Sequence, residues 1–125
     1  MDGSSLDKAK ALQDRTKQFA IRIIRMHQAL PKASEAQILG KQVVRSGTSV
    51  AANYRAACRS RSRPEFLAKM GLVVEEADET VFWLELLVDA GIVSQNKMKG
   101  LLGEGNELLA VFSASRRTAR GNRTL

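Results

Sequence analysis

The chain has 125 residues, of which 44% are hydrophobic and 26% charged, so it has the size and composition of one folded domain with a modest core. Its formal net charge of +7 favours RNA, DNA or an anionic membrane surface as a partner, with a merely solvated basic surface as the alternative. A single cysteine excludes an intrachain disulfide, no apolar run reaches the roughly 20 residues that cross a membrane, and no signal peptide pattern begins the chain, so we expect a cytoplasmic protein with no membrane partner.

Two helices are predicted in the first half of the chain. Apolar residues recur at helical spacing over residues 6–30, and Pro31 ends this first helix because proline disfavours helical geometry in the residue before it. The second helix is predicted over residues 34–61. It begins with Ser34 and Gln37, whose spacing is that of a capping box, in which each side chain accepts a bond from a free backbone N–H of the other.

Two further helices are predicted in the second half. Ser62 and Glu65 form another capping-box pattern, Pro64 lies in the first turn where its missing N–H is tolerated, and Gly91 ends this third helix. Ser94 caps the fourth helix, whose apolar face is interrupted by glycines. Residues 116–125 contain four arginines and no apolar period, which predicts a basic disordered tail.

The loops between these helices are short, so consecutive helices are expected to be antiparallel neighbours. The predicted fold is all-α, an antiparallel up-down four-helix bundle over residues 1–115, followed by the tail at residues 116–125. The charges are unevenly distributed along it: residues 1–62 carry twelve Lys and Arg against four Asp and Glu, whereas residues 63–91 carry two against seven. A basic second helix therefore precedes an acidic third helix.

The second predicted helix has three faces when its residues are placed about 100° apart around the helix axis. One face is apolar and is expected to point to the core. On roughly the opposite side lies a basic stripe, which consists of Lys41, Arg45, Arg55 and Arg59. Between these two faces runs a polar row, which includes Gln42, Ser46, Ser49 and Asn53.

The polar row borders the core, so its side chains need hydrogen-bond partners. An unpartnered buried polar group costs about 1–3 kcal/mol, so Asn53 is expected to have a hydrogen-bond partner if it is buried, and another helix could supply it. Two interpretations are open: a satisfied contact that fixes helix register, which is the favoured one, and a ligand contact. The small residue Gly47 indicates a close helix crossing, either within the bundle or between subunits.

The basic stripe is predicted to contact phosphates. It continues into the following loop and the tail, so the candidate nucleic-acid interface also includes Arg61, Arg63, Arg116, Arg117 and Arg120. The alternative is that these cations are solvated, or that some of them pair with the acidic third helix within or between chains. Exposed ion pairs contribute only about 0–1 kcal/mol, so their energy does not decide between the two.

Patterns typical of catalysis, metal binding or cofactor binding are absent from the sequence. His27 is the only histidine, and the residue three positions before it is not acidic, so the Glu-x-x-His pairs of di-iron bundles are missing. The glycines between residues 100 and 105 lie in a helical pattern and not in a phosphate-binding loop after a strand. We therefore predict a protein that is not an enzyme and has neither a cofactor nor a metal.

Several blocks of residues, in order, resemble one known family. The longest is QVVRSGTSVAANYR at residues 42–55, and the others are Ser62, Glu65-Phe66, Glu76 to Thr80 and Trp83 to Leu87. Together they closely resemble the bacterial four-helix bundle family related to the protein encoded in intervening sequences of large-subunit ribosomal RNA genes. The resemblance is strong over residues 39–87 and weak in the flanking helices.

The resemblance implies a small up-down bundle that assembles as a ring, typically a homopentamer. The same family includes the accessory protein of diversity-generating retroelements, a basic pentamer that binds nucleic acid and partners a reverse transcriptase. It therefore implies a non-enzymatic nucleic-acid-binding accessory protein, with RNA or DNA and a reverse transcriptase as candidate partners. A structural or protein-interaction bundle without a nucleic-acid ligand is the alternative. The chain departs from the family pattern at Ala56, usually Glu, and at Cys58, usually Arg, and the second change removes one charge from the basic stripe.

Overall fold

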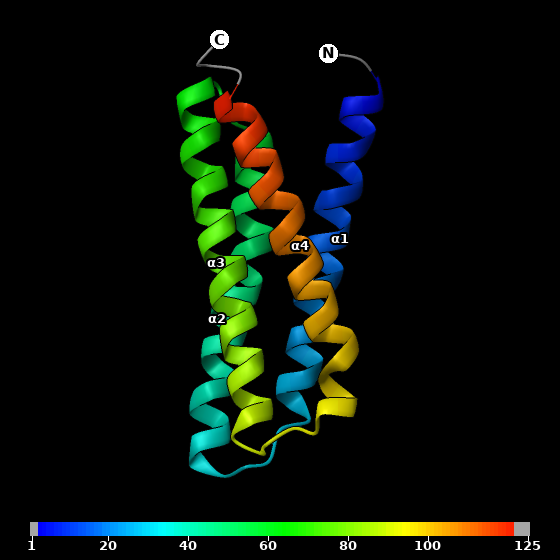
Figure 1. Ribbon diagram of the computed structural model, residues 1–125, viewed down its shortest axis with the longest axis vertical. Helices are drawn as coiled ribbons and strands as arrows, with labels where there is room; N and C mark the ends of the chain where they lie inside the picture. The colour runs from blue at the N-terminus through cyan, green and yellow to red at the C-terminus, as the bar shows by residue number, and fades with distance from the viewer. Residues whose placement is uncertain (1–2, 122–125) are drawn as a thin grey trace.

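The computed structural model describes residues 3–121, which form four long helices joined by short loops. They are α1 (Gly3–Gln28), α2 (Ser34–Cys58), α3 (Arg63–Asp89) and α4 (Gln95–Gly121). Each helix runs antiparallel to the one before it. The α1–α2 and α3–α4 loops lie at one end of the bundle, whereas the α2–α3 loop, the start of α1 and the end of α4 lie at the other (Figure 1). The predicted all-α up-down four-helix bundle is confirmed.

Both ends of α3 follow their sequence signals. The Ser62 side chain accepts a hydrogen bond from the Glu65 N–H at 3.2 Å, so the predicted N-cap is confirmed. At the other end, Gly91 has a φ of 76°, a left-handed conformation that glycine adopts without a steric penalty. Its N–H donates to the Val88 carbonyl and the next N–H donates to the Leu87 carbonyl, which together form a Schellman motif.

The start of α2 differs from the prediction. Ala33, and not Ser34, is the residue that precedes the helix, and no side chain caps it. The Gln37 side chain donates to the Pro31 carbonyl at 2.9 Å, while the Gln37 N–H donates to the Ala33 carbonyl at 3.1 Å. The predicted capping box at Ser34 is therefore wrong, because the backbone enters the helix one residue earlier and the preceding loop holds the Gln37 amide.

The fourth helix continues to Gly121, so the predicted disordered tail is wrong over residues 116–121. Two contacts with α3 hold these last turns. The Arg63 guanidinium donates to the Ala119 carbonyl, and the Arg116 guanidinium lies 3.3 Å from where a Cβ on Gly71 would be. An apolar period is missing here because arginine side chains, rather than hydrophobic ones, pack on α3. Residues 122–125, which belong to the predicted tail, lie outside the described residues.

The hydrophobic core runs along the bundle axis and receives side chains from every helix. The Tyr54 and Phe112 rings pack with their centroids 4.8 Å apart. Gly47 lies so close to Ile23 that a Cβ at this position would be 2.4 Å from the isoleucine side chain. The predicted close crossing is therefore between α1 and α2, inside the bundle. The largest fully buried core side chains include Phe19, Ile23, Val43, Val50, Met70, Val73, Leu84, Leu87, Met98, Leu108 and Phe112.

The seam between α1 and α4 is the most loosely packed of the four seams between neighbouring helices. Figure 1 shows α1 leaning away from α4 toward the end where α1 begins. A charge cluster bridges the seam near its middle. The Arg15 Nε lies 2.7 Å from the Glu104 carboxylate and its Nη2 lies 2.9 Å from that of Glu107. The hydrogen bond from Arg15 lowers the pKa of the Glu104 carboxyl, although burial acts in the opposite sense.

Candidate nucleic-acid interface

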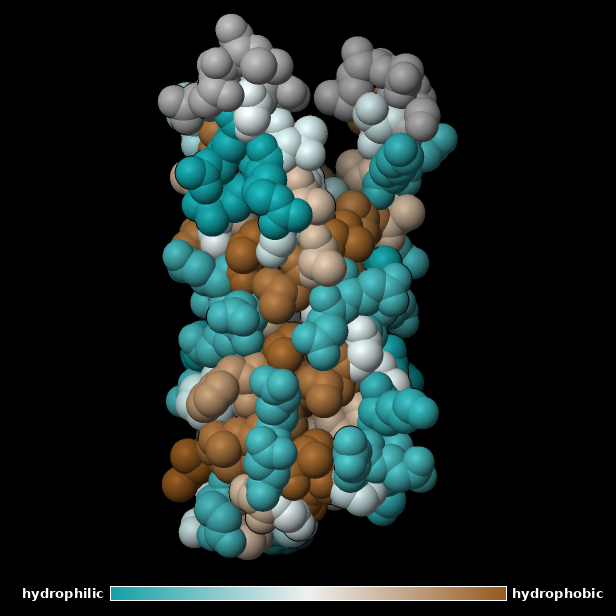
Figure 2. All heavy atoms as spheres, viewed as in Figure 1, coloured by the Kyte–Doolittle hydropathy of each residue, from teal (hydrophilic) through white to brown (hydrophobic). Residues whose placement is uncertain are grey.

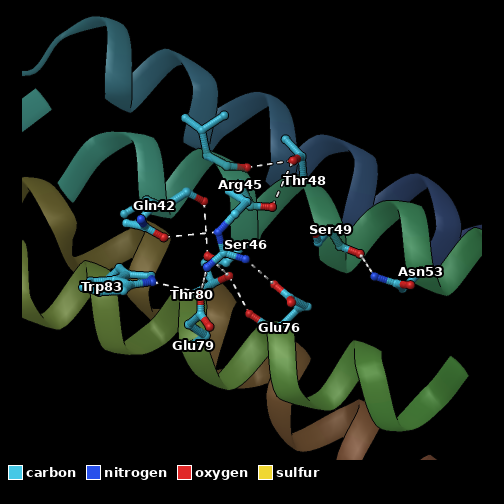
Figure 3. Close-up of polar contacts among 12 residues, drawn as sticks. Gln42, Arg45, Ser46, Thr48, Ser49, Asn53, Glu76, Glu79, Thr80 and Trp83 are labelled. Atoms are coloured by element: carbon cyan, nitrogen blue, oxygen red, sulfur yellow. Dashed lines mark hydrogen bonds and ion pairs between the residues drawn. The ribbon is translucent and has the colours of Figure 1, made fainter. Parts of the chain in front are cut away.

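The middle of the predicted basic stripe faces acidic residues of α3 (Figure 3). Arg45 forms ion pairs with Glu79 and, at 3.4 Å, with Glu76. Its Nε donates to the Gln42 side-chain oxygen at 3.1 Å, and the Trp83 indole N–H donates to the Glu79 carboxylate at 3.1 Å. The structure therefore places Arg45 in a network with α3. Pairing with the acidic third helix was the alternative to phosphate binding that the sequence left open for this residue.

The polar row of α2 makes one buried contact with α3. Ser46 and Thr80 are both completely buried, and their hydroxyl oxygens are 2.8 Å apart. The Thr80 hydroxyl also lies 2.6 Å from the Glu76 carbonyl, so it has a backbone acceptor one turn back in its own helix. Asn53 is only partly buried, so the condition for a bond to another helix is not met, and its side chain donates to the Ser49 carbonyl within α2 at 2.9 Å. The contact between helices is thus carried by Ser46, whose partner Thr80 was not singled out by the sequence pattern.

Basic residues gather where α2 passes into α3. This loop lies at the upper end of the bundle in Figure 1. They surround a depression of about 440 Å³, called the basic depression below. Two alanines of α2 also line it, and their small side chains leave the hollow open between the longer cations. The described residues that line it are Ala52, Arg55, Ala56, Arg59, Arg61, Glu65 and Lys69.

Glu65 is the single acidic residue among those that line the basic depression. The backbone holds it in place, because its carboxylate accepts from the Arg61 N–H at 3.2 Å and its own N–H donates to Ser62. Within residues 3–121, none of the four cations around the depression forms a side-chain ion pair. The depression therefore has an excess of positive charge that no carboxylate of these described residues pairs with directly.

The end of α4 adds further cations to the same end of the bundle. Arg117 and Arg120 are exposed, whereas Arg116 is half-buried and its Nε has no hydrogen-bond partner. Figure 2 shows strongly hydrophilic side chains gathered over this end of α4. We call the complete group the basic end, which consists of Arg55, Arg59, Arg61, Arg63, Lys69, Arg116, Arg117 and Arg120.

Seven of the nine cations predicted for the interface thus lie at the basic end, and Lys41 and Arg45 do not. Lys41 is exposed on the same stripe, but it precedes Arg55 by about 21 Å of helix at ~1.5 Å per residue. Lys69 belongs to the site although sequence reasoning missed it. The available signal was its place one helical turn after Glu65, on the same face of the third helix.

An acidic groove of about 480 Å³ lies on α3, further along the helix from the basic depression. Phe82 lies in it with 53% of its surface exposed, and its ring packs edge-on against Trp83 at 5.0 Å between centroids. Across residues 3–121 no group of acidic, His or Cys side chains has an arrangement that could hold a metal ion. The described residues that line the acidic groove are Glu75, Asp78, Glu79, Phe82 and Glu85.

None of the helices within the described part of the chain is long and apolar enough to cross a membrane.

Comparison with known proteins agrees with this architecture. The chain is similar to a protein of unknown function from the S23 ribosomal protein family of Bacteroides thetaiotaomicron, whose crystal structure superposes with a TM-score of 0.81 at 29% identity. The similarity covers 88% of this chain and 98% of that one. No curated protein matches the sequence. A model of the 23S rRNA-intervening sequence protein family matches residues 9–114, which include most of all four helices, and the chain therefore belongs to that family.

Proposed function

We propose that this protein is a non-enzymatic accessory protein that binds RNA or DNA through the phosphate backbone at its basic end. The observation that carries the proposal is the basic depression, where Arg55, Arg59, Arg61 and Lys69 surround one hollow without side-chain ion pairs in the described residues. Phosphates that meet such cations release their condensed counterions, which favours binding. Arginine also matches the geometry of phosphate oxygens with two parallel N–H donors.

The composition of the depression favours backbone contacts over base contacts. No aromatic side chain is among the described residues that line it, and single-stranded bases are usually held by stacking on aromatic rings. The exposed aromatic residue Phe82 lies instead in the acidic groove, where phosphates are repelled. The proposed binding therefore discriminates weakly between base sequences, because phosphate contacts carry no direct sequence information.

The proposed unit of function is a homo-oligomeric ring, a homopentamer on the resemblance described above. A ring repeats the basic end once per subunit, so a nucleic acid that spans several subunits gains affinity by multivalency. A reverse transcriptase is a candidate partner of the same assembly, and only the family resemblance supports it.

A salt titration of binding tests the proposal. Short RNA and DNA, each as duplex and single strand of equal length, are titrated by filter binding between about 50 and 200 mM salt. We expect affinity to fall steeply with salt, and Arg61→Gln to reduce the logarithmic slope by about 0.7–0.9 for its lost contact. Lys41→Gln removes the same charge away from the basic end and is the matched control. Absence of affinity at low salt, or equal effects of the two variants, would contradict the proposal.

A second candidate function is a protein-interaction bundle without a nucleic-acid ligand, and the acidic groove favours it. Glu75, Asp78 and Glu85 have no ion pair among the described residues, and the half-exposed Phe82 offers apolar surface beside them. This candidate predicts an oligomer that ignores polyanions and dissociates in Glu75→Lys. Light scattering of Glu75→Lys against Asp14→Lys, a charge reversal on α1, tests the role of the acidic groove in assembly. Because the first candidate is also an oligomer, the salt titration above separates the two: an assembled protein without affinity for RNA or DNA at low salt supports this second candidate.

A further inference from the structure

A second hollow lies at the end of the bundle opposite the basic end. It is a cavity of about 690 Å³ between the last turns of α1, the first turns of α4 and the short segments next to them. Cavities that hold small molecules in proteins usually have volumes of about 300–1,000 Å³. Its lining comes from α1 and α4 on both sides of their seam, which is the most loosely packed of the four seams.

The inner lining of this cavity is apolar. Leu30, Met98 and Leu101 are almost fully buried core side chains that also line it, so the hydrophobic core of the bundle is continuous with the cavity wall. Met26 and Ile92 are half-buried around them. This lining offers a ligand apolar contact and few hydrogen bonds, so the buried part of a ligand must be hydrocarbon.

The polar lining is almost entirely cationic. Arg22, Arg25 and Lys97 are exposed at the cavity, and no Asp or Glu is among the described residues that line it. The one lining hydroxyl, that of Ser94, already accepts from the Lys97 N–H at 3.2 Å. Over residues 3–121 none of the three cations has an ion pair within 4 Å, although Arg22 is near enough to Glu104 to lower its pKa.

We propose that this cavity binds an amphipathic monoanion, which is a carboxylate carried on a hydrocarbon chain or ring. The hydrocarbon part occupies the apolar lining, where the transfer of each CH₂ group out of water favours binding. The carboxylate lies among Arg25, Lys97 and Arg22, where it supplies the negative charge that the lining lacks. A nucleic-acid backbone does not fit this site, because it has no hydrocarbon segment to place against the core side chains.

Methionine methyl groups report on the cavity directly. Met26 and Met98 line it, whereas Met70 is completely buried in the core away from it. In protein labelled with ¹³C at the methionine methyls, we expect decanoate to shift the Met26 and Met98 signals saturably and to leave the Met70 signal in place. Decanol has the same chain without the charge, and we expect it to bind at least fivefold more weakly, because one exposed ion pair of about 1 kcal/mol already accounts for fivefold and the carboxylate meets more than one cation.

Charge-removing variants test the role of the cations. Arg25→Gln combined with Lys97→Gln changes only exposed side chains, and we expect it to raise the dissociation constant for decanoate about tenfold. The affinity for decanol is expected to be unchanged. Lys32→Gln combined with Lys99→Gln removes the same charge from neighbouring positions that do not line the cavity, and we expect it to bind decanoate like the unmodified protein.

Several outcomes would overturn the proposal. One is a shift of Met70 together with the other two methionines, which would show general perturbation of the core. Another is equal affinity for decanoate and decanol, or an equal loss in the two double variants. A third is that a synthetic acidic amphipathic peptide shifts Met26 and Met98 while decanoate does not, which would assign the hollow to a partner helix instead.

Discussion

Arg45 lies within α2 and Arg59 directly follows its last residue, and both belong to the predicted basic stripe, yet their surroundings differ. Arg45 meets the acidic middle of α3 and pairs with two of its carboxylates, whereas Arg59 lies at the basic depression beside Lys69. Because α2 and α3 are antiparallel, the middle of one helix faces the middle of the other, and the end of α2 faces the start of α3. The role of an arginine on one helix is thus decided by the residues that the topology places opposite it.

The same comparison separates two ways in which a basic helix is used. In the middle of α2, charge and buried hydroxyl groups join the helix to α3, through Arg45 and through Ser46 with Thr80. At its end, the cations form no ion pair among the described residues and surround a hollow that Glu65 alone lines with negative charge. We infer that the middle holds the bundle together and that the end is available to a ligand.

The largest expected effect comes from removing three cations of the basic depression together. In Arg55→Gln/Arg59→Gln/Arg61→Gln we expect affinity for duplex RNA or DNA at low salt to fall roughly a hundredfold or more, because about three phosphate contacts are lost. The logarithmic salt slope should fall by roughly 2–3. Filter binding measures both. A variant with three lysines of α1 changed to glutamine, Lys8, Lys10 and Lys17, has the same net charge, and an equal loss there would contradict a localised interface.

The next effect concerns the buried hydroxyl pair that joins the middle of the two helices. Thr80→Val keeps the side-chain shape but leaves the buried Ser46 hydroxyl with only the long bond to the Val43 carbonyl at 3.4 Å, so we expect the free energy of unfolding to fall by about 1–3 kcal/mol. Adding Ser46→Ala removes this weakly bonded hydroxyl and should recover part of that loss. Urea unfolding of both single variants and the double variant measures the coupling. Strict additivity would mean that the two hydroxyls do not interact.

The ion pair between Arg15 and Glu104 is more buried than the ion pairs of Arg45, and its contribution to stability can be compared with theirs. Since Arg15 lowers the pKa of Glu104, the pair stabilises the fold fully above the ordinary carboxyl pKa of about 4.3, and this contribution is lost as the pH falls through the lowered pKa. We expect Glu104→Gln to lose about 1 kcal/mol at pH 7 and little at pH 2. Unfolding curves at the two pH values test this, and an equal loss at both would assign the effect to packing.

The smallest expected effect is that of Arg45 itself. Its side chain is 48% exposed, so its ion pairs with Glu76 and Glu79 are screened by solvent and salt. Arg45→Gln should lower the free energy of unfolding by about 0–1 kcal/mol, and less at high salt. Thermal unfolding at low and high salt measures the difference. A loss above that of Glu104→Gln would show that the exposed pair is the stronger of the two.

The features that sequence reasoning found are those with local causes. Apolar period placed the helices, and the side-chain caps at Ser62 and Ser94 and the glycine at Gly91 follow from backbone groups that each helix end leaves free. The capping box expected at Ser34 has the same local pattern, and it failed because the Gln37 amide bonds to the preceding loop. A local pattern is therefore decisive only where no neighbouring group competes for the same side chain.

The features that sequence reasoning missed depend on contacts between helices. Thr80, Lys69 and the end of α4 are defined by what lies opposite them, and no periodicity within one helix contains that information. The pair of Arg15 with Glu104 joins positions far apart in the chain for the same reason. The basic stripe is predicted from the period of one helix alone, but its division into a paired middle and an unpaired end becomes visible only with α3 beside it.

The central claim is that phosphates bind at the end of the basic stripe and not at its middle. The most direct measurement compares the salt dependence of nucleic-acid binding for Arg59→Gln and Arg45→Gln, two equal changes on one stripe. Our account predicts that Arg59→Gln lowers the logarithmic slope by about 0.7–0.9 and that Arg45→Gln leaves it unchanged. A lower slope in Arg45→Gln, or the same slope in both variants, would contradict it.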